Sequence, residues 1–110
     1  MKYMLLINVD PSQWSDDMHA EYMAYSQALV ESGELVAGDA LQGRETATTV
    51  RVREGAVGVT DGPFAESKEH VGGYYVIDVK DLDRAIELAA KIPDARTGGI
   101  EVRPVLEFSM

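Results

Sequence analysis

A histidine and a carboxylate at the ends of two predicted elements are the first residues of this chain that suggest chemistry. His19 lies within a segment of helical periodicity, and Asp39 lies near the end of a predicted strand. A histidine that is oriented by a carboxylate can act as a general base near neutral pH. The alternative interpretation is that His19 is an exposed side chain beside Asp16 and Asp17. The sequence leaves both interpretations open.

A second candidate site lies in the tight-turn segment Asp61-Gly62-Pro63-Phe64. One interpretation places Asp61 at the mouth of a pocket as a catalytic carboxylate, with Phe64 as an apolar wall. The structural alternative is that the Asp61 side chain bonds the backbone two residues on, while Gly62 and Pro63 supply the turn dihedrals.

Several other kinds of site are excluded by composition. The chain has no cysteine, so it has no disulfide, zinc–thiolate site or thiol nucleophile. Its two histidines have no paired spacing, and we expect no dedicated metal site. Gly72-Gly73 precedes a predicted strand rather than a helix, unlike a phosphate-binding loop. We therefore expect no cofactor.

The charge balance excludes two classes of partner. The formal net charge is −9, and no basic cluster is present that would displace counterions from nucleic acid or attract an anionic membrane. No apolar run approaches the ~20 residues that cross a bilayer. The apolar stretch Tyr3–Ile7 is too short for a signal-peptide core. We expect a cytoplasmic protein.

The elements that must position these residues follow from periodicity and turn signals within a single domain of 110 residues. A helix is predicted between Ser15, as its cap, and Gly33, with Met18, Tyr22, Tyr25 and Leu29 on one face. A second helix is predicted between Asp81 and Pro93. The predicted strands are residues 2–9, 34–41, 46–53, 56–60, 74–79 and 100–108.

This order is β-α-β, a β-rich insertion, and β-α-β again. It predicts an α+β fold, the ferredoxin-like split β-α-β sandwich, with an inserted β-hairpin and both helices on one face of the sheet. Yet the central strands are apolar on both faces, since Tyr3 and Leu5 alternate with Met4 and Leu6. We expect the uncovered face to pack against a second copy in a homodimer. The alternative is that the loop 54–72 covers it.

Three segments carry a resemblance to a known family: the Asp61–Phe64 motif with the residues after it, Val71-Gly72-Gly73-Tyr74-Tyr75, and the ending at 99–104. Over essentially its whole length the chain resembles the YCII-related family, in the branch named for its DGPF motif. The resemblance implies a dimeric α+β barrel of two ferredoxin-like sheets packed face to face. It also implies a histidine and an aspartate in a cleft. The family histidine falls at Tyr22 in this chain, with His19 one turn earlier.

Two functions from different classes follow. The first is a cofactor-free enzyme or ligand binder that acts on a small molecule in a pocket near the dimer interface. Its catalytic candidates are Asp61 and His19, and its ligand-binding candidates are Tyr22, Asp39 and Phe64. The second is a non-catalytic regulatory or interaction module linked to sigma-factor-controlled transcription, since some relatives are encoded beside alternative sigma factors.

Overall fold

The computed structural model describes residues 1–63 and 70–108 of the chain. Its strands are β1 (Lys2–Val9), β2 (Leu35–Ala40), β3 (Thr48–Arg53), β4 (Ala56–Asp61), β5 (His70–Asp78) and β6 (Gly99–Pro104). Its helices are α1 (Asp17–Ser32) and α2 (Leu82–Ala90), with the short 3-10 turns η1 (Pro11–Gln13), η2 (Arg44–Thr46) and η3 (Pro93–Ala95).

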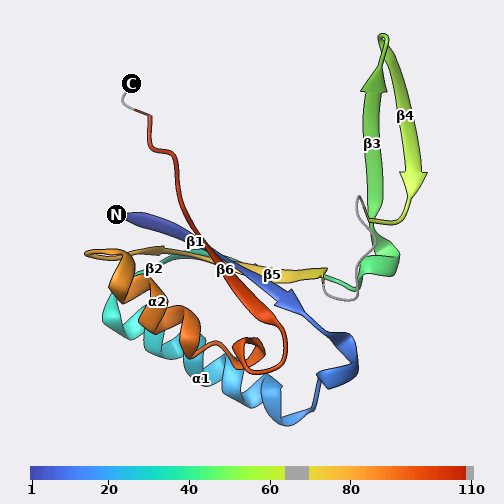
Figure 1. Cartoon of the computed structure of the whole chain (residues 1–110). Helices are drawn as coiled ribbons and strands as arrows, with labels where there is room; N and C mark the ends of the chain where they lie inside the picture. The colour runs from blue at the N-terminus through green and yellow to red at the C-terminus, as the bar shows by residue number, and fades with distance from the viewer. Residues whose placement is uncertain (64–69, 109–110) are drawn as a thin grey trace.

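Four of these strands form one antiparallel sheet in the order β2-β5-β1-β6. Both helices lie on one side of this sheet (Figure 1). This strand order and the one-sided helices are those of a ferredoxin-like fold, so the predicted α+β class is confirmed. The predicted hairpin is also present, as the separate two-stranded ribbon β3–β4.

Local signals in the sequence account for three of the four helix ends. Gly33 follows α1 with φ 76°, a left-handed conformation that glycine adopts without steric cost. The Asp81 carboxylate caps α2 by accepting a hydrogen bond from the Arg84 N–H. Pro93 begins η3 shortly after α2 ends. The start of α1 differs from the prediction, because Asp16 rather than Ser15 occupies the cap position.

The core lies between the helices and one face of the sheet. Alternate residues of β1 point toward it, and Tyr3, Leu5 and Ile7 are buried there. Tyr25 and Leu29 of α1 pack against these strand residues. On the other face of the sheet, Met4, Leu6, Tyr74 and Val76 are half-buried. We call these four residues the outer face.

The β3–β4 ribbon, which we call the arm, extends from one end of the sheet on the side opposite the helices (Figure 1). Val50 pairs with Val59 and Val52 with Val57, so all four valines share one face of the arm. Each is more than half exposed, between 56% and 68%. Residues 54–61 belong to this projecting arm and do not cover the outer face.

Two strand boundaries differ from the prediction by four residues. β5 begins at His70, because His70 pairs with Val9 and Gly73 pairs with Ile7 and with Ala40. β6 ends at Pro104, although the prediction extended the strand to residue 108. Proline lacks the N–H that the ladder needs, and one further bond, from the Val105 N–H to the Lys2 carbonyl, follows it.

Candidate functional site

A pocket of about 770 Å³ lies between the first half of α1 and the end of the sheet formed by β1, β2 and β5. Its lining includes residues from β1 and the segment after it (Ile7, Val9, Asp10, Trp14), from α1 (His19, Tyr22, Met23, Ser26), from β2 and β5 (Gly38, Asp39, Ala40, His70, Gly73, Tyr74, Tyr75) and from η3 (Asp94). The pocket therefore combines segments that are far apart in sequence.

Glycines in the sheet account for the space. Gly38 is opposite Tyr75 and Gly73 is opposite Ala40 in the β2–β5 ladder. A Cβ added at Gly38 would lie 2.8 Å from Tyr75 Cδ1, and one added at Gly73 would lie 2.9 Å from the Asp39 carbonyl oxygen. Gly38 therefore leaves room for the Tyr75 ring, and Gly73 brings bare backbone to the pocket. The result is a low floor beneath the helix.

An aromatic wall stands beside this floor. The Trp14 and Tyr22 rings are stacked, with centroids 6.3 Å apart and planes inclined by 23°. Tyr22 occupies the helix face that was predicted to be buried, and it packs against the edge of the core. The wall and floor make the pocket predominantly apolar, as small-molecule sites usually are.

The principal polar pair of the pocket is Tyr22 and Asp94. The Tyr22 hydroxyl donates a hydrogen bond to Asp94 Oδ2. Asp94 is only 3% exposed and lies in η3, 72 residues further along the chain than Tyr22. Burial raises the pKa of Tyr22, and the hydrogen bond to the Asp94 carboxylate raises it further. Tyr22 is therefore a neutral phenol at physiological pH, with its proton directed toward Asp94.

A second pair of hydroxyl groups lies deeper in the pocket. Ser26 Oγ and the Tyr75 hydroxyl oxygen are 2.7 Å apart, and either can donate. The Tyr75 ring in turn meets Tyr25 edge-on, with centroids 5.3 Å apart. The Tyr25 hydroxyl donates to the Leu88 carbonyl, 2.8 Å away, which ties α1 to α2. Burial raises the pKa of Tyr25, so this bond persists across physiological pH.

His19 and Asp39 both line the pocket, but the Asp39 carboxylate pairs with Tyr74 and not with His19. His19 is exposed at the rim of the pocket, one turn before Tyr22. The Asp39 carboxylate accepts a hydrogen bond of 2.8 Å from the Tyr74 hydroxyl. Tyr75 faces the helices, so its neighbour Tyr74 and the paired Asp39 point to the other side of the sheet. Hydrogen bonding to Asp39 raises the pKa of Tyr74 and keeps this phenol protonated.

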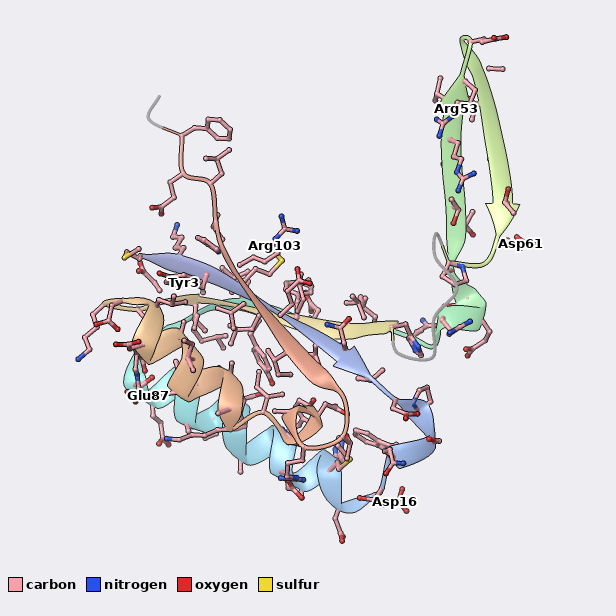
Figure 2. All side chains as sticks on the ribbon, in the orientation of Figure 1. Tyr3, Asp16, Arg53, Asp61, Glu87 and Arg103 are labelled. Atoms are coloured by element: carbon pink, nitrogen blue, oxygen red, sulfur yellow. The ribbon has the colours of Figure 1, made fainter. Side chains whose placement is uncertain are left out.

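Asp61 ends β4 and is not among the described residues that line the pocket. Figure 2 shows Asp61 at the root of the arm and Arg53 further toward its tip. The expected bond from Asp61 to the backbone two residues on does not form, because Pro63 has no N–H. The turn is held instead by Gly62, whose N–H donates to the Ala47 carbonyl at 2.8 Å and whose carbonyl accepts from Thr49 Oγ1 at 2.7 Å. Phe64 lies outside the described residues.

Sequence reasoning missed two residues of the pocket. Asp94 follows a proline that stops a helix, and such a residue is usually at the surface. His70 is the first residue of β5 and also lines the pocket. Its Nδ1 atom is buried without a hydrogen-bond partner among residues 1–63 and 70–108. No local pattern distinguishes either residue from a surface residue.

The described part of the chain lacks two kinds of feature. Within it, no three His, Cys, Asp or Glu side chains converge as metal ligands would. Neither helix described has both the length and the apolar character needed to cross a bilayer.

Comparison with known proteins gives two matches. The model of the YCII-related domain matches residues 1–109, nearly the whole chain. An uncharacterised protein of Rhizobium meliloti (strain 1021) is 38% identical over 100 residues, an alignment that covers 86% of this chain and 81% of the relative. The family resemblance drawn from the sequence is therefore confirmed, and the chain belongs to the YCII-related family.

Proposed function

We propose that the protein binds a small, largely apolar organic molecule in the pocket between α1 and the glycine floor. The observation that carries this proposal is the pocket itself: about 770 Å³ with an aromatic wall and only a few polar groups. Pockets that bind small molecules usually have volumes of about 300–1,000 Å³ and a similar balance of surfaces.

If the protein is an enzyme, the reaction that we propose for this pocket is proton transfer without a cofactor. His19 at the rim is the candidate general base, because an imidazole nitrogen can accept a proton from a substrate. Tyr22 would orient the substrate, because its hydroxyl is fixed by Asp94. Asp39 and Asp61 have no part in this arrangement, since one faces the outer side of the sheet and the other lies on the arm.

Thermal-shift and calorimetric screening with small aromatic compounds tests the binding function. We expect at least one class of compound to raise the melting temperature, because a ligand that binds only the folded state stabilises it. Ala40→Leu adds bulk to the pocket lining and should weaken that binding. Ala24→Leu, at an exposed position of α1 that is not among the described lining residues, is the matched control. Equal binding by both variants, or none by the wild type, would contradict the proposal and favour a non-catalytic interaction module.

We also propose that the protein is a homodimer in which the outer faces of two sheets pack together as a dimeric α+β barrel. Two features support this. The outer face is apolar, and the arm rises on the same side of the sheet, so it would flank a partner seated there (Figure 1). A sheet of this kind needs cover on both faces when both are apolar. Sedimentation equilibrium should give about twice the chain mass of 12.0 kDa, and a monomer at micromolar concentration would contradict the dimer.

A further inference from the structure

We infer that the ligand of this pocket is a cationic amine attached to an aromatic or other flat apolar group. The inference rests on the proposed binding function and names the class of ligand. The juxtaposition that supports it is a buried carboxylate without a counter-charge, Asp94, behind an aromatic wall in a pocket whose described lining has no lysine or arginine.

The buried Asp94 carboxylate forms no salt bridge in the described part of the chain. The hydrogen bond from Tyr22 is the one that this carboxylate makes to a described residue. The nearest arginine in sequence, Arg96, pairs with Glu21 at 2.7 Å instead. A buried carboxylate is costly unless a positive charge compensates it. A bound ammonium group would provide that compensation.

The Tyr22 hydroxyl links the Asp94 carboxylate to the pocket. Its hydroxyl proton is directed toward Asp94, so the lone pairs of its oxygen remain for a donor in the pocket. The carboxylate behind it makes the oxygen a stronger acceptor. The face of the adjacent Trp14 ring, stacked with Tyr22, attracts a cation through its quadrupole. These groups together suit an N–H-bearing cation better than a neutral hydroxyl.

The remaining charges of the lining disfavour an anion. Besides Asp94, the described lining contains Asp10 and Asp39. Asp10 is held by the Ser12 N–H and hydroxyl at 3.1 and 2.7 Å, and Asp39 faces the outer side of the sheet with Tyr74. An anionic ligand would meet these carboxylates, and the described lining offers no lysine or arginine to offset them, its basic side chains being His19 and His70.

A matched series of three ligands tests the inference on the wild-type protein by calorimetry near neutral pH. The series is phenethylamine, phenethyl alcohol and hydrocinnamate, which share a ring and a short chain but are cationic, neutral and anionic. We expect the amine to bind about tenfold or more tighter than the alcohol, as a charge-assisted hydrogen bond predicts. Hydrocinnamate should bind more weakly than the alcohol.

Two variants test whether Asp94 causes the preference for the amine over the alcohol. Asp94→Asn keeps the side-chain shape and should reduce the ratio of amine to alcohol affinity to about twofold or less. Asp39→Asn alters a different carboxylate of the lining, one that accepts a hydrogen bond from Tyr74, and should leave the ratio unchanged. If Asp94→Asn does not fold, the wild-type series still decides the question.

The possible outcomes separate the two proposals. Equal affinity for amine and alcohol, or tighter binding of hydrocinnamate, would overturn the amine inference while the binding function stands. A preference that Asp39→Asn removes and Asp94→Asn leaves intact would also overturn it. Failure of all three compounds to bind, together with an unproductive aromatic screen, would overturn the binding function itself.

Discussion

Two tyrosine–aspartate pairs in this protein have the same chemistry but lie in different surroundings. Tyr22 donates to Asp94, which is 3% exposed, whereas Tyr74 donates to Asp39 at an exposed position. The free-energy cost of losing a hydrogen bond depends on the acceptor that is left. A buried acceptor without a partner lowers the stability of the folded state, whereas an exposed acceptor forms a hydrogen bond to water instead. The two pairs therefore differ in their importance for stability.

Tyr22→Phe should lower the free energy of unfolding by about 1–3 kcal/mol, because it leaves the buried Asp94 carboxylate without its hydroxyl partner. Tyr74→Phe, the matched control, should change it much less, because the Asp39 carboxylate is exposed to water. Urea unfolding of both variants near neutral pH measures the difference. Equal losses would show that Asp94 reaches water in the folded protein.

At this scale the sequence revealed part of the pocket. Tyr22 and His19 were found because helical periodicity places Tyr22 on the buried face and His19 at its margin. Asp94 was missed because its burial depends on η3 packing beside α1 and the β1 strand, a contact between distant segments. Asp39 was identified as a candidate, but the side of the sheet it faces follows from the β2–β5 register, which includes a bulge between Leu35 and Ala37.

At the scale of elements, the pocket exists because β2 and β5 carry glycine beneath α1. Gly38→Ala should lower the unfolding free energy by about 1–3 kcal/mol, since its Cβ would lie 2.8 Å from Tyr75 Cδ1 and 3.1 Å from the Tyr74 carbonyl oxygen. It should also weaken ligand binding by displacing the Tyr75 ring. Gly99→Ala, with no atom within 4 Å of the new Cβ, is the control and should be neutral or slightly stabilising. Thermal unfolding measures both variants. Equal melting temperatures would show that Tyr75 and the Tyr74 carbonyl do not crowd a side chain at position 38.

A bidentate ion pair joins the α1–β2 turn to α2 and gives stability a pH dependence. Arg84 Nε and Nη2 donate to the two Glu34 carboxylate oxygens at 2.9 and 2.7 Å. Hydrogen bonding to Arg84 lowers the pKa of Glu34 to about 2, below the ordinary value of 4.5. The pair therefore contributes stability fully above about pH 4.5, and this contribution is lost as the pH falls toward 2.

Glu34→Gln should destabilise the protein near neutral pH, and the difference from wild type should shrink as the pH approaches about 2. Glu101→Gln is the control, because the Glu101–Arg103 pair is exposed and its closest distance is 3.7 Å. Urea unfolding at several pH values measures both variants. A Glu34→Gln effect that is constant from neutral to acidic pH would contradict the ion pair's role.

The elements themselves were largely predictable, and the errors have physical causes. The strand 2–9 and the α1 end at Gly33 followed from local composition and were confirmed. On α2, Ala85, Leu88 and Ala89 are buried, whereas Leu82 and Ile86 are 48% and 50% exposed. Which apolar residues of α2 are buried depends on how the helix packs against the sheet, which periodicity alone does not determine.

At the scale of the whole molecule, the arm makes the chain extended. The radius of gyration is 15.9 Å, against about 13 Å for a compact domain of this length. The sequence predicted the hairpin from its alternating residues, but its direction relative to the sheet had no local signal. Arg51 and Arg53 balance Glu54 and Asp61, so residues 48–61 add nothing to the net charge of −9. A neutral ribbon with one valine face is suited to contact a second acidic copy without strong repulsion.

The double variant Val50→Thr, Val59→Thr should weaken the proposed dimer, because it replaces two methyl groups of the valine face with hydroxyls while keeping β-branched side chains. Thr60→Ser, on the other face of the arm, is the control. Sedimentation velocity over a range of concentrations measures the dissociation constant of each. An unchanged constant for the double variant would exclude the valine face from the dimer contact.

The most direct test of the pocket as the functional site is the measurement of intermolecular nuclear Overhauser effects between an aromatic amine such as phenethylamine and the isotope-labelled protein. We expect nuclear Overhauser effects from the ligand ring to Trp14, Tyr22 and Met23, all of which line the pocket. Contacts only to the arm valines or to the outer-face residues Met4 and Leu6 would contradict this expectation. They would show that the molecule binds small compounds on its uncovered apolar surfaces and not beneath α1.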